Sequence, residues 1–226
     1  MSALGSYSAE DIILIIMEVV IIVGAIMFHE ISHGFAAYRL GDNTAKNAGR
    51  LSLNPLKHLD LFGSFILPLL LAISHMPVIG YAKPVPYNPN NLRNRKSGEV
   101  IVGLAGPAAN LVLALVFALL ANIVFNYVTT ASGFLYWLWQ FCAYSTLINL
   151  CLMFFNLIPL PPLDGSSLIA PFLSNKAMVT YYKIERYSMP ILLIVLIVVP
   201  WLTGLDPVGW YIEHTAYSFG YFLLGL

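Results

Sequence analysis

Long apolar runs separated by short polar stretches dominate the hydropathy pattern of this chain. The segment 12–28 is apolar except for Glu18, and with its flanks it is long enough to span a membrane as a helix. Two further long apolar segments cover 100–128 and 134–158, and a clear but shorter run covers 190–202. The pattern therefore predicts an all-α polytopic membrane protein with about five to six transmembrane helices.

Two other apolar stretches are not simple spans. The segment 61–80 is short and contains Pro68 and Pro77, which favours a re-entrant hairpin over a continuous helix. A sixth true span is the alternative for this segment. The aromatic stretch 211–226 fits either an interfacial helix or a short span.

Charged residues are sparse, and their placement predicts a topology. They make up 10% of the 226 residues, against about 25% in soluble domains. The formal net charge of zero excludes a nucleic-acid binder that works through a basic face. All eleven Lys and Arg lie in three clusters, at 39–57, 83–96 and 176–186. The positive-inside rule places these clusters in the cytoplasm, so that 100–128 runs outward and 134–158 returns.

The motif His29-Glu30-x-x-His33 stands at the inner end of the first predicted helix. Two His at positions i and i+4 share one helical face, and both can reach one Zn²⁺ at about 2.0–2.1 Å. Glu30 lies beside them, where its carboxylate can take a proton from zinc-bound water. Ionisable residues in a membrane segment are costly and mark functional sites. The alternative is that both His cap the helix end, with Glu30 as their partner.

A catalytic zinc needs a third protein ligand and an open position for water. Asp164 stands out because it lies in an apolar region and, by the predicted topology, at the depth of His29 and His33. From the residues alone, a turn or N-cap role before Gly165 explains Asp164 equally well. The remaining candidates are His58, Asp60, His75, Glu99, Glu213 and His214.

Three sequence blocks together resemble the site-2 protease family of intramembrane zinc metalloproteases, in its small prokaryotic form without a PDZ or nucleotide-binding domain. They are the HExxH block ending at Gly34, the Gly-Pro-x-x-Asn block at 106–110, and the stretch 156–165 with its Leu-Asp-Gly ending. The stretch 49–55 is similar to the strand-forming segment that follows the HExxH helix in this family. The resemblance covers roughly residues 11–175.

This resemblance implies a role for each matching residue. His29, His33 and Asp164 would hold one Zn²⁺. Glu30 would be the general base, which activates the attacking water and later protonates the leaving amine. Asn156 matches a family Asn thought to steady the substrate or the oxyanion, and a side-chain amide can fill that role. An inter-helix hydrogen bond is the alternative for Asn156.

Two further segments invite hypotheses. Asn110 could lie near the site, although the small residues before it in the 103–109 stretch favour helix packing as the explanation of that block. We hypothesise that 48–54 or the 61–80 hairpin holds the substrate as an extended strand, because an unfolded substrate helix needs partners for its backbone amides. A plain amphipathic connection is equally compatible with 48–54.

The sequence thus predicts a zinc-dependent intramembrane endopeptidase forming a single domain over 1–226, with a catalytic core at 11–175 and C-terminal helices at 176–226. Its expected partners are the lipid bilayer and membrane proteins whose transmembrane segments it cleaves, with no nucleic acid. Its expected location is a prokaryotic plasma membrane, with the active site toward the cytoplasm. The alternative is a membrane zinc carrier or sensor with the same ligands. Glu30 separates the two, because a carrier needs no acid beside the His pair.

Overall fold

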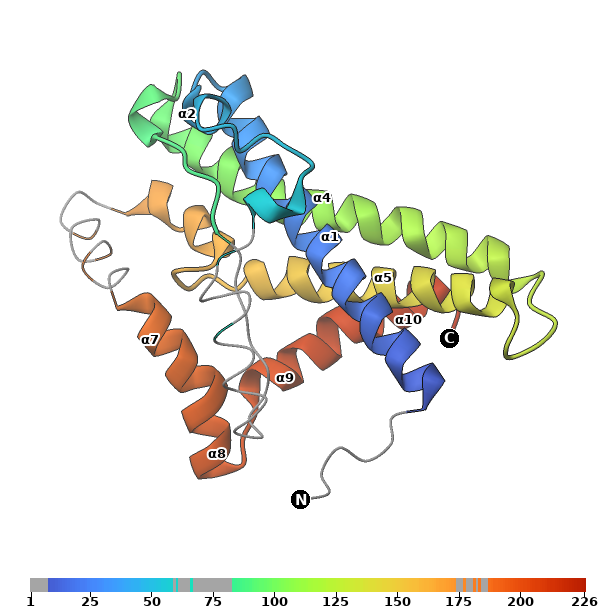
Figure 1. Ribbon diagram of the computed structural model, residues 1–226. Helices are drawn as coiled ribbons and strands as arrows, with labels where there is room; N and C mark the ends of the chain where they lie inside the picture. Colours follow the sequence, from blue (N-terminus) through green and yellow to red (C-terminus); the bar gives the residue numbers. More distant parts are fainter. Residues whose placement is uncertain are drawn as a thin grey trace.

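The computed structural model describes residues 8–58, 60, 66, 83–173, 177, 181, 183 and 187–226. Within these residues every regular element is helical. Three helices are long and apolar enough to cross a membrane: α1 (Ala9–Arg39), α4 (Arg95–Phe125) and α5 (Phe134–Asn156). Figure 1 shows α1 lying across α4 and α5, and α1 contacts both of them. The prediction of an all-α chain is confirmed for the described residues, and three of their helices are candidate membrane spans.

Helix α1 begins and ends at recognisable sequence signals. The Ser8 hydroxyl accepts from the Asp11 amide at 3.1 Å, and the Asp11 carboxylate accepts from the Ser8 amide at 2.9 Å, so the two form a capping box. Arg39 lies in the last turn, where a cation suits the helix dipole. Gly41 follows with a φ of 112°, which glycine tolerates best. The exposed face between these ends is aliphatic and includes Ile12, Ile13, Ile15, Ile16, Val19, Val20 and Ile22.

Small residues allow α4 and α5 to pack closely. Ala114, Ala118 and Ala121 recur on one face of α4, and none exposes more than 3% of its surface. Ala114 packs in a cluster with Leu150 of α5, and Ala121 packs in a cluster with Cys142 of α5. In a bilayer, small side chains favour helix association because they let the backbones approach. This packing sets the position of α5 relative to α4, and both helices contribute to the site.

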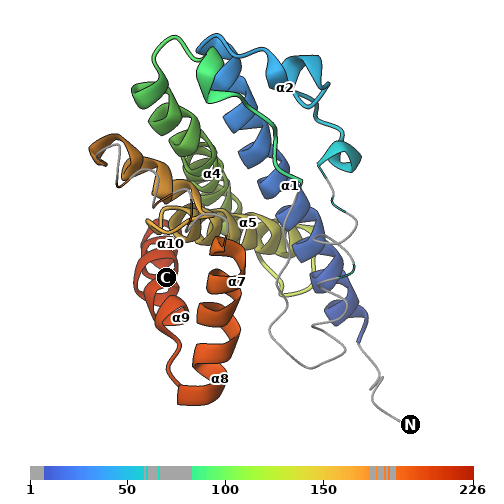
Figure 2. The ribbon, with the colours of Figure 1, turned by 90° about the vertical axis from the view of Figure 1, so that its left-hand side faces the viewer.

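The C-terminal part of the chain is a pair of helical arms bent by 107° relative to each other, which Figure 2 shows meeting beneath the long helices. Gly204, with a φ of 69°, ends the first arm. The first arm contains α7 (Ser188–Leu193), the π-helical turn η6 (Ile194–Val198) and α8 (Val199–Thr203); the second contains α9 (Pro207–Ile212), the π-helical turn η7 (Glu213–Tyr217) and α10 (Ser218–Leu224). If the bent pair counts as one span, the described residues contain up to four spans. The expected five to six spans are therefore not confirmed.

Outside the long helices and the C-terminal arms, the described residues form short helical turns. They are α2 (Thr44–Asn47), η1 (Pro55–Lys57), η3 (Pro89–Asn91), η4 (Asp164–Leu168) and η5 (Ala170–Phe172). The strand hypothesised at 48–54 is not found there, because Ala48 and Gly49 form a turn and the Arg50 amide donates back to the Ala45 carbonyl at 2.9 Å. The hairpin expected at 61–80 lies outside the described residues, apart from Ile66.

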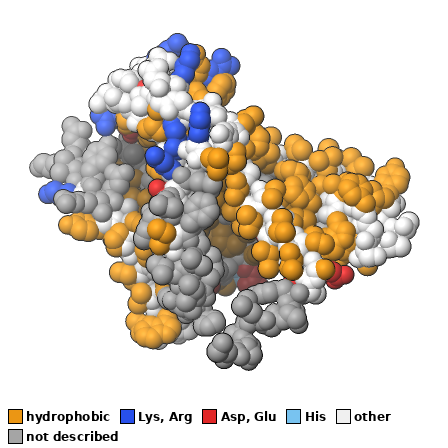
Figure 3. Space-filling view, in the orientation of Figure 1, with side chains coloured by type: hydrophobic (Ala, Val, Ile, Leu, Met, Phe, Trp, Pro, Cys, Tyr) orange, Lys and Arg blue, Asp and Glu red, His pale blue; other side chains and the backbone are white. Residues whose placement is uncertain are grey.

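Charged and apolar side chains occupy different parts of the surface (Figure 3). Lys and Arg side chains gather at the end of the molecule where α1 ends and α4 begins. Apolar side chains cover the lengths of α1 and α4 on the same face. This separation is what a helix bundle needs if its apolar part lies in lipid and one end lies in water.

Candidate metal centre

The structure brings His29, His33 and Asp164 together. His29 Nε2 lies 3.0 Å from Asp164 Oδ2, and His33 Nε2 lies 3.3 Å from the same oxygen. The two Nε2 atoms are 3.0 Å apart. The His29, His33 and Asp164 side chains are 9%, 12% and 20% exposed. Among the described residues, this is the one group of His, Cys, Asp and Glu whose ligand atoms lie within 4.8 Å of one another.

Helix α1 supplies the two His one turn apart, and a tight loop supplies Asp164. The loop returns from α5 to η4 so closely that a Cβ on Gly165 would lie 2.5 Å from the Leu157 carbonyl carbon and 2.7 Å from the Ile158 oxygen. On the side of the loop that faces α4, a Cβ on Gly103 would lie 3.3 Å from the main-chain oxygen of Asp164. These two glycines let η4 approach α4 and set Asp164 against the His pair.

Gly106 of α4 leaves the space in which the two imidazoles meet. A Cβ at this position would collide with His33 Nε2, and it would lie 2.6 Å from both Cε1 and Nε2 of His29. Real Cβ atoms essentially never approach a heavy atom that closely. Gly106 thus allows Nε2 of His29 and Nε2 of His33 to lie beside Asp164.

Each imidazole is oriented through its other nitrogen. His29 Nδ1 lies 2.6 Å from Asn110 Oδ1, and His33 Nδ1 lies 2.6 Å from the Val102 carbonyl oxygen. Because both partners are acceptors, they assign the ring proton to Nδ1 in each His. The two Nε2 atoms then present lone pairs toward the carboxylate of Asp164. This is the outer arrangement usual for metal-bound His.

These residues fit a zinc ion. Asp164 Oδ2 is buried and has no hydrogen-bond partner among the described residues; in the neutral form of each His, the Nε2 atom beside it carries a lone pair. Three acceptor atoms at 3.0 to 3.3 Å repel one another unless a cation lies between them. Two imidazole nitrogens and one carboxylate oxygen form a donor set typical of catalytic zinc.

Glu30 is held by the main chain of a proline-rich segment. Its Oε2 accepts from the Val85 amide at 2.8 Å. Val85 lies between Pro84 and Pro86, which have no N–H, so it supplies the one amide donor of this tripeptide. The contact fixes one carboxylate oxygen of Glu30.

Two buried charged residues anchor this same segment. Arg50 Nη2 donates to the Lys83 oxygen at 2.6 Å and to the Pro84 oxygen at 3.3 Å. Asp42 is fully buried and accepts from the Asn88 amide at 2.7 Å and from Nδ2 of Asn91 at 2.8 Å.

Burial raises the pKa of the Asp42 carboxyl, but hydrogen bonds from Thr44, Asn91 and Asn88 lower the pKa by more, so the group remains ionised. Sequence reasoning missed Asp42, Arg50 and Val85, because nothing in their local pattern reveals these long-range partners.

Asn156 and Asn110 have different partners in the structure. The Asn156 amide donates to the Leu152 carbonyl of its own helix at 2.9 Å, and the structure gives no hydrogen bond between Asn156 and the three clustered side chains among the described residues. Asn110, for which helix packing was the favoured explanation, instead contacts His29 directly. The polar member of the Gly-Pro-x-x-Asn block therefore belongs to the site.

The other candidate third ligands have different roles where they are described. His58 Nε2 is 2.8 Å from the Ser52 oxygen, Glu99 pairs with Arg95 at 2.9 Å, and His214 Nδ1 is 2.8 Å from the Trp210 oxygen. His75 lies outside the described residues. Asp164 is thus the carboxylate that the structure places beside the His pair.

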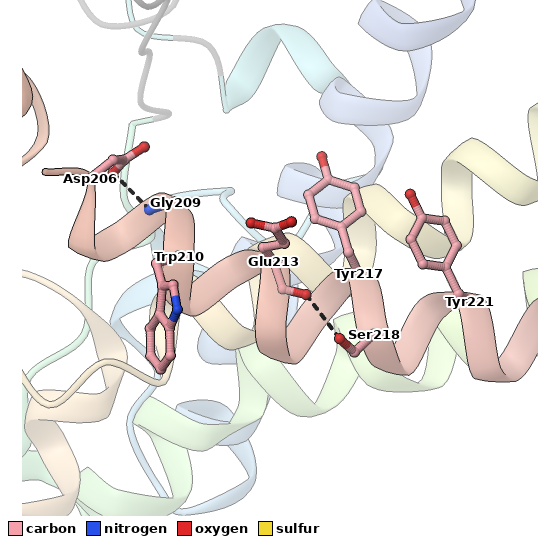
Figure 4. A pocket seen from close by; sticks show the side chains of 7 residues that line it. All are labelled: Asp206, Gly209, Trp210, Glu213, Tyr217, Ser218 and Tyr221. Carbon is pink, nitrogen blue, oxygen red and sulfur yellow. Dashed lines mark hydrogen bonds between the residues drawn. The ribbon is translucent and has the colours of Figure 1, made fainter. Parts of the chain in front are cut away.

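A separate pocket of about 680 Å³ lies along the second C-terminal arm (Figure 4). Its lining includes Asp206, Trp210, Glu213, Tyr217 and Tyr221. The Asp206 carboxylate is engaged in capping α9, since it accepts from the Gly209 amide at 2.8 Å. None of the clustered His and Asp side chains lines this pocket.

Comparisons with known proteins relate this chain to a peptidase family. The family model of Peptidase family M50 matches residues 17–138 and 128–199. YwhC of Bacillus subtilis is 36% identical over 183 residues, which cover 80% of each chain. Rip2 of Mycolicibacterium smegmatis is 28% identical over 205 residues, covering 88% of this chain and 75% of that protein. Both relatives carry names that describe them provisionally as zinc metalloproteases. No solved structure matches the chain significantly.

Proposed function

Because the chain belongs to peptidase family M50, we propose that it is a zinc-dependent endopeptidase that cleaves transmembrane segments of other membrane proteins. The names of its relatives support a metalloprotease, and its three long apolar helices support a membrane location. The observation that carries the proposal is the convergence of three possible ligand atoms from His29, His33 and Asp164.

In this proposal His29, His33 and Asp164 hold one Zn²⁺ per chain. Bound zinc lowers the pKa of a coordinated water and polarises the scissile carbonyl. The outer contacts from Asn110 and Val102 keep the two imidazoles turned toward the carboxylate, so no reorientation is needed when the ion binds.

Glu30 is the proposed general base. The Val85 amide occupies Oε2 of its carboxylate, so Oε1 is the oxygen that takes the proton from the attacking water. The same group then delivers the proton to the leaving amine. A carboxylate fixed through one oxygen loses less freedom at the reacting geometry, which lowers the entropic cost of the proton transfer.

Asn156 is the proposed donor to the substrate or the oxyanion. It occupies the last position of α5, eight residues before Asp164. Its amide donates to Leu152 in the absence of substrate, so it must exchange that partner for the substrate oxygen. Such an exchange costs little, because a carbonyl oxygen has two lone pairs and the Leu152 carbonyl still accepts from a main-chain amide of its helix.

The proposed site faces the cytoplasm of a prokaryotic plasma membrane. His33 lies less than two turns before Arg39 at the end of α1, which is the end where Lys and Arg side chains gather in Figure 3. Basic residues beside a span favour the cytoplasmic side. Substrates are therefore expected to be membrane proteins cut near the cytoplasmic end of a transmembrane segment.

The test pairs zinc content with cleavage of single-span membrane peptides, using purified wild type, Glu30→Gln and Asp164→Ala. We expect one zinc and cleavage for the wild type, zinc without cleavage for Glu30→Gln, and loss of zinc for Asp164→Ala. Cleavage by Glu30→Gln at the wild-type rate would contradict the assignment of the base. A wild type and a Glu30→Gln variant that both move zinc across a vesicle membrane, with no cleavage by either, would favour a zinc carrier.

A further inference from the structure

A buried chain of side-chain amides connects His29 of α1 to the backbone of α5. Asn110 on α4 contacts His29 Nδ1 through Oδ1 at 2.6 Å, and its Nδ2 donates to Asn149 Oδ1 at 2.9 Å. Asn149 on α5 then donates through Nδ2 to the Ser145 carbonyl at 2.8 Å. Asn110 is fully buried and Asn149 is 1% exposed. Three helices are thus joined by one line of hydrogen bonds that ends on a coordinating imidazole.

The direction of every hydrogen bond in this series follows from the Ser145 carbonyl at its α5 end. The Ser145 carbonyl can only accept, so Asn149 must face it with Nδ2 and turn Oδ1 toward α4. Asn110 must then donate to Asn149 through Nδ2, and the Ala25 carbonyl, 3.4 Å from the same nitrogen, requires the same orientation. Asn110 Oδ1 is left facing His29, where it can only accept. Neutral His29 therefore carries its proton on Nδ1.

We propose that Asn110 and Asn149 are positioning residues that fix the orientation of the His29 ring, so that its Nε2 points to the side where the metal would bind. The inference rests on the zinc site of the proposed function. The two His differ in how this is achieved. His33 relies on the Val102 main-chain carbonyl, which no substitution removes, whereas His29 relies on two side chains from two other helices.

The competing explanation is that the two Asn only join helices. Inter-helix hydrogen bonds of membrane Asn are common, and a purely structural role predicts that zinc affinity and stability change together. A positioning role predicts that they separate. Asn110→Asp keeps an acceptor for His29 Nδ1 but loses the donor to Asn149 and Ala25. Asn110→Leu has a similar size and loses both.

The experiment measures the Zn²⁺ affinity of the purified full chain by competition with a chromophoric chelator, together with Tm and the absorption spectrum of the Co²⁺-substituted protein. The variants are Asn110→Leu, Asn110→Asp and Asn149→Leu. Asn122→Leu is the matched control, because Asn122 also lies on α4 and its amide also joins two helices, donating to Ala118 at 2.9 Å and to Leu223 at 2.8 Å.

We expect Asn110→Leu to bind zinc about 10- to 100-fold more weakly, as loss of an outer partner of a metal-bound His usually does, with an altered Co²⁺ spectrum. Asn149→Leu should show a smaller loss in the same direction. Asn110→Asp should keep near-wild-type zinc affinity despite a lower Tm, and the Asn122→Leu control should lower Tm alone.

Wild-type zinc affinity in Asn110→Leu would overturn the proposal. If Asn110→Leu does not fold, either of two other results overturns the proposal. One is wild-type zinc affinity in Asn149→Leu. The other is a loss of zinc affinity in Asn110→Asp that is as large as its loss of stability predicts. A wild type that binds no zinc would refute the proposed function itself, which separates the two failures.

Discussion

Replacing Gly106 with alanine is expected to damage the metal centre without damaging the helix that carries it. An added Cβ would lie 2.6 Å from His29 Nε2, whereas ordinary contact begins at 3.4 Å, and it would also collide with His33 Nε2. The rings must therefore move by about 0.8 Å, several times the roughly 0.2 Å that metal–ligand distances tolerate. Alanine otherwise favours a helix interior by about 0.5–1 kcal/mol over glycine, so α4 should remain folded.

The assay is zinc affinity by chelator competition, with circular dichroism to report helix content. We expect Gly106→Ala to lose at least about tenfold in affinity, in keeping with displaced ligands, and to retain wild-type helix content. Gly24→Ala on α1 is the control, since a Cβ there meets no atom within 4 Å. Zinc binding by Gly106→Ala as tight as in the wild type would refute the reasoning, because the imidazoles would then not need the space beside this glycine.

Two further predictions concern the segment that holds Glu30. Val85→Pro removes the amide that donates to Glu30. Zinc content should be unchanged, while kcat/KM should fall by about 10²-fold, as when other catalytic groups are misplaced. The control Val85→Ala keeps the amide and should remain active. Asp42→Asn should lower the free energy of unfolding by about 1–3 kcal/mol at pH 7, because buried donors lose their carboxylate partner. Because folding lowers the pKa of Asp42, the extra stability of the wild type over Asp42→Asn is complete above about pH 4 and disappears as the pH falls through the folded-state pKa. A difference in the free energy of chemical unfolding that does not change with pH would contradict this.

The long helices and the expected depth of Asp164 follow from patterns that are local in the sequence, whereas its place beside the His pair is implied by the family resemblance. Apolar length predicts α1, α4 and α5, because a bilayer requires about 20 apolar residues for each span. The clustering of Lys and Arg predicts the direction of each span, and this predicted direction puts the C-terminal end of α5 at the same expected depth as His29. Such inferences need only the length and charge of each segment.

The contacts between helices could not be predicted in the same way. Whether Asn110 faces His29 depends on the rotation of α4 about its axis and on its crossing with α1, and neither is encoded in a single stretch of sequence. The absence of the strand predicted at 48–54 has a local cause. Gly49 takes a φ of 64°, and the chain turns back so that the Arg50 amide donates to the Ala45 carbonyl. A pattern of alternation over a few residues cannot exclude such a turn.

The identity of the ligands around bound zinc tests the central claim most directly. X-ray absorption at the zinc edge of the purified wild type should show two imidazoles and one or two oxygen ligands at about 2.0–2.1 Å. This result would match His29, His33, Asp164 and a water. A sulfur ligand at about 2.3 Å, which would require Cys142 or Cys151, or a site with fewer than two imidazoles, would contradict the account.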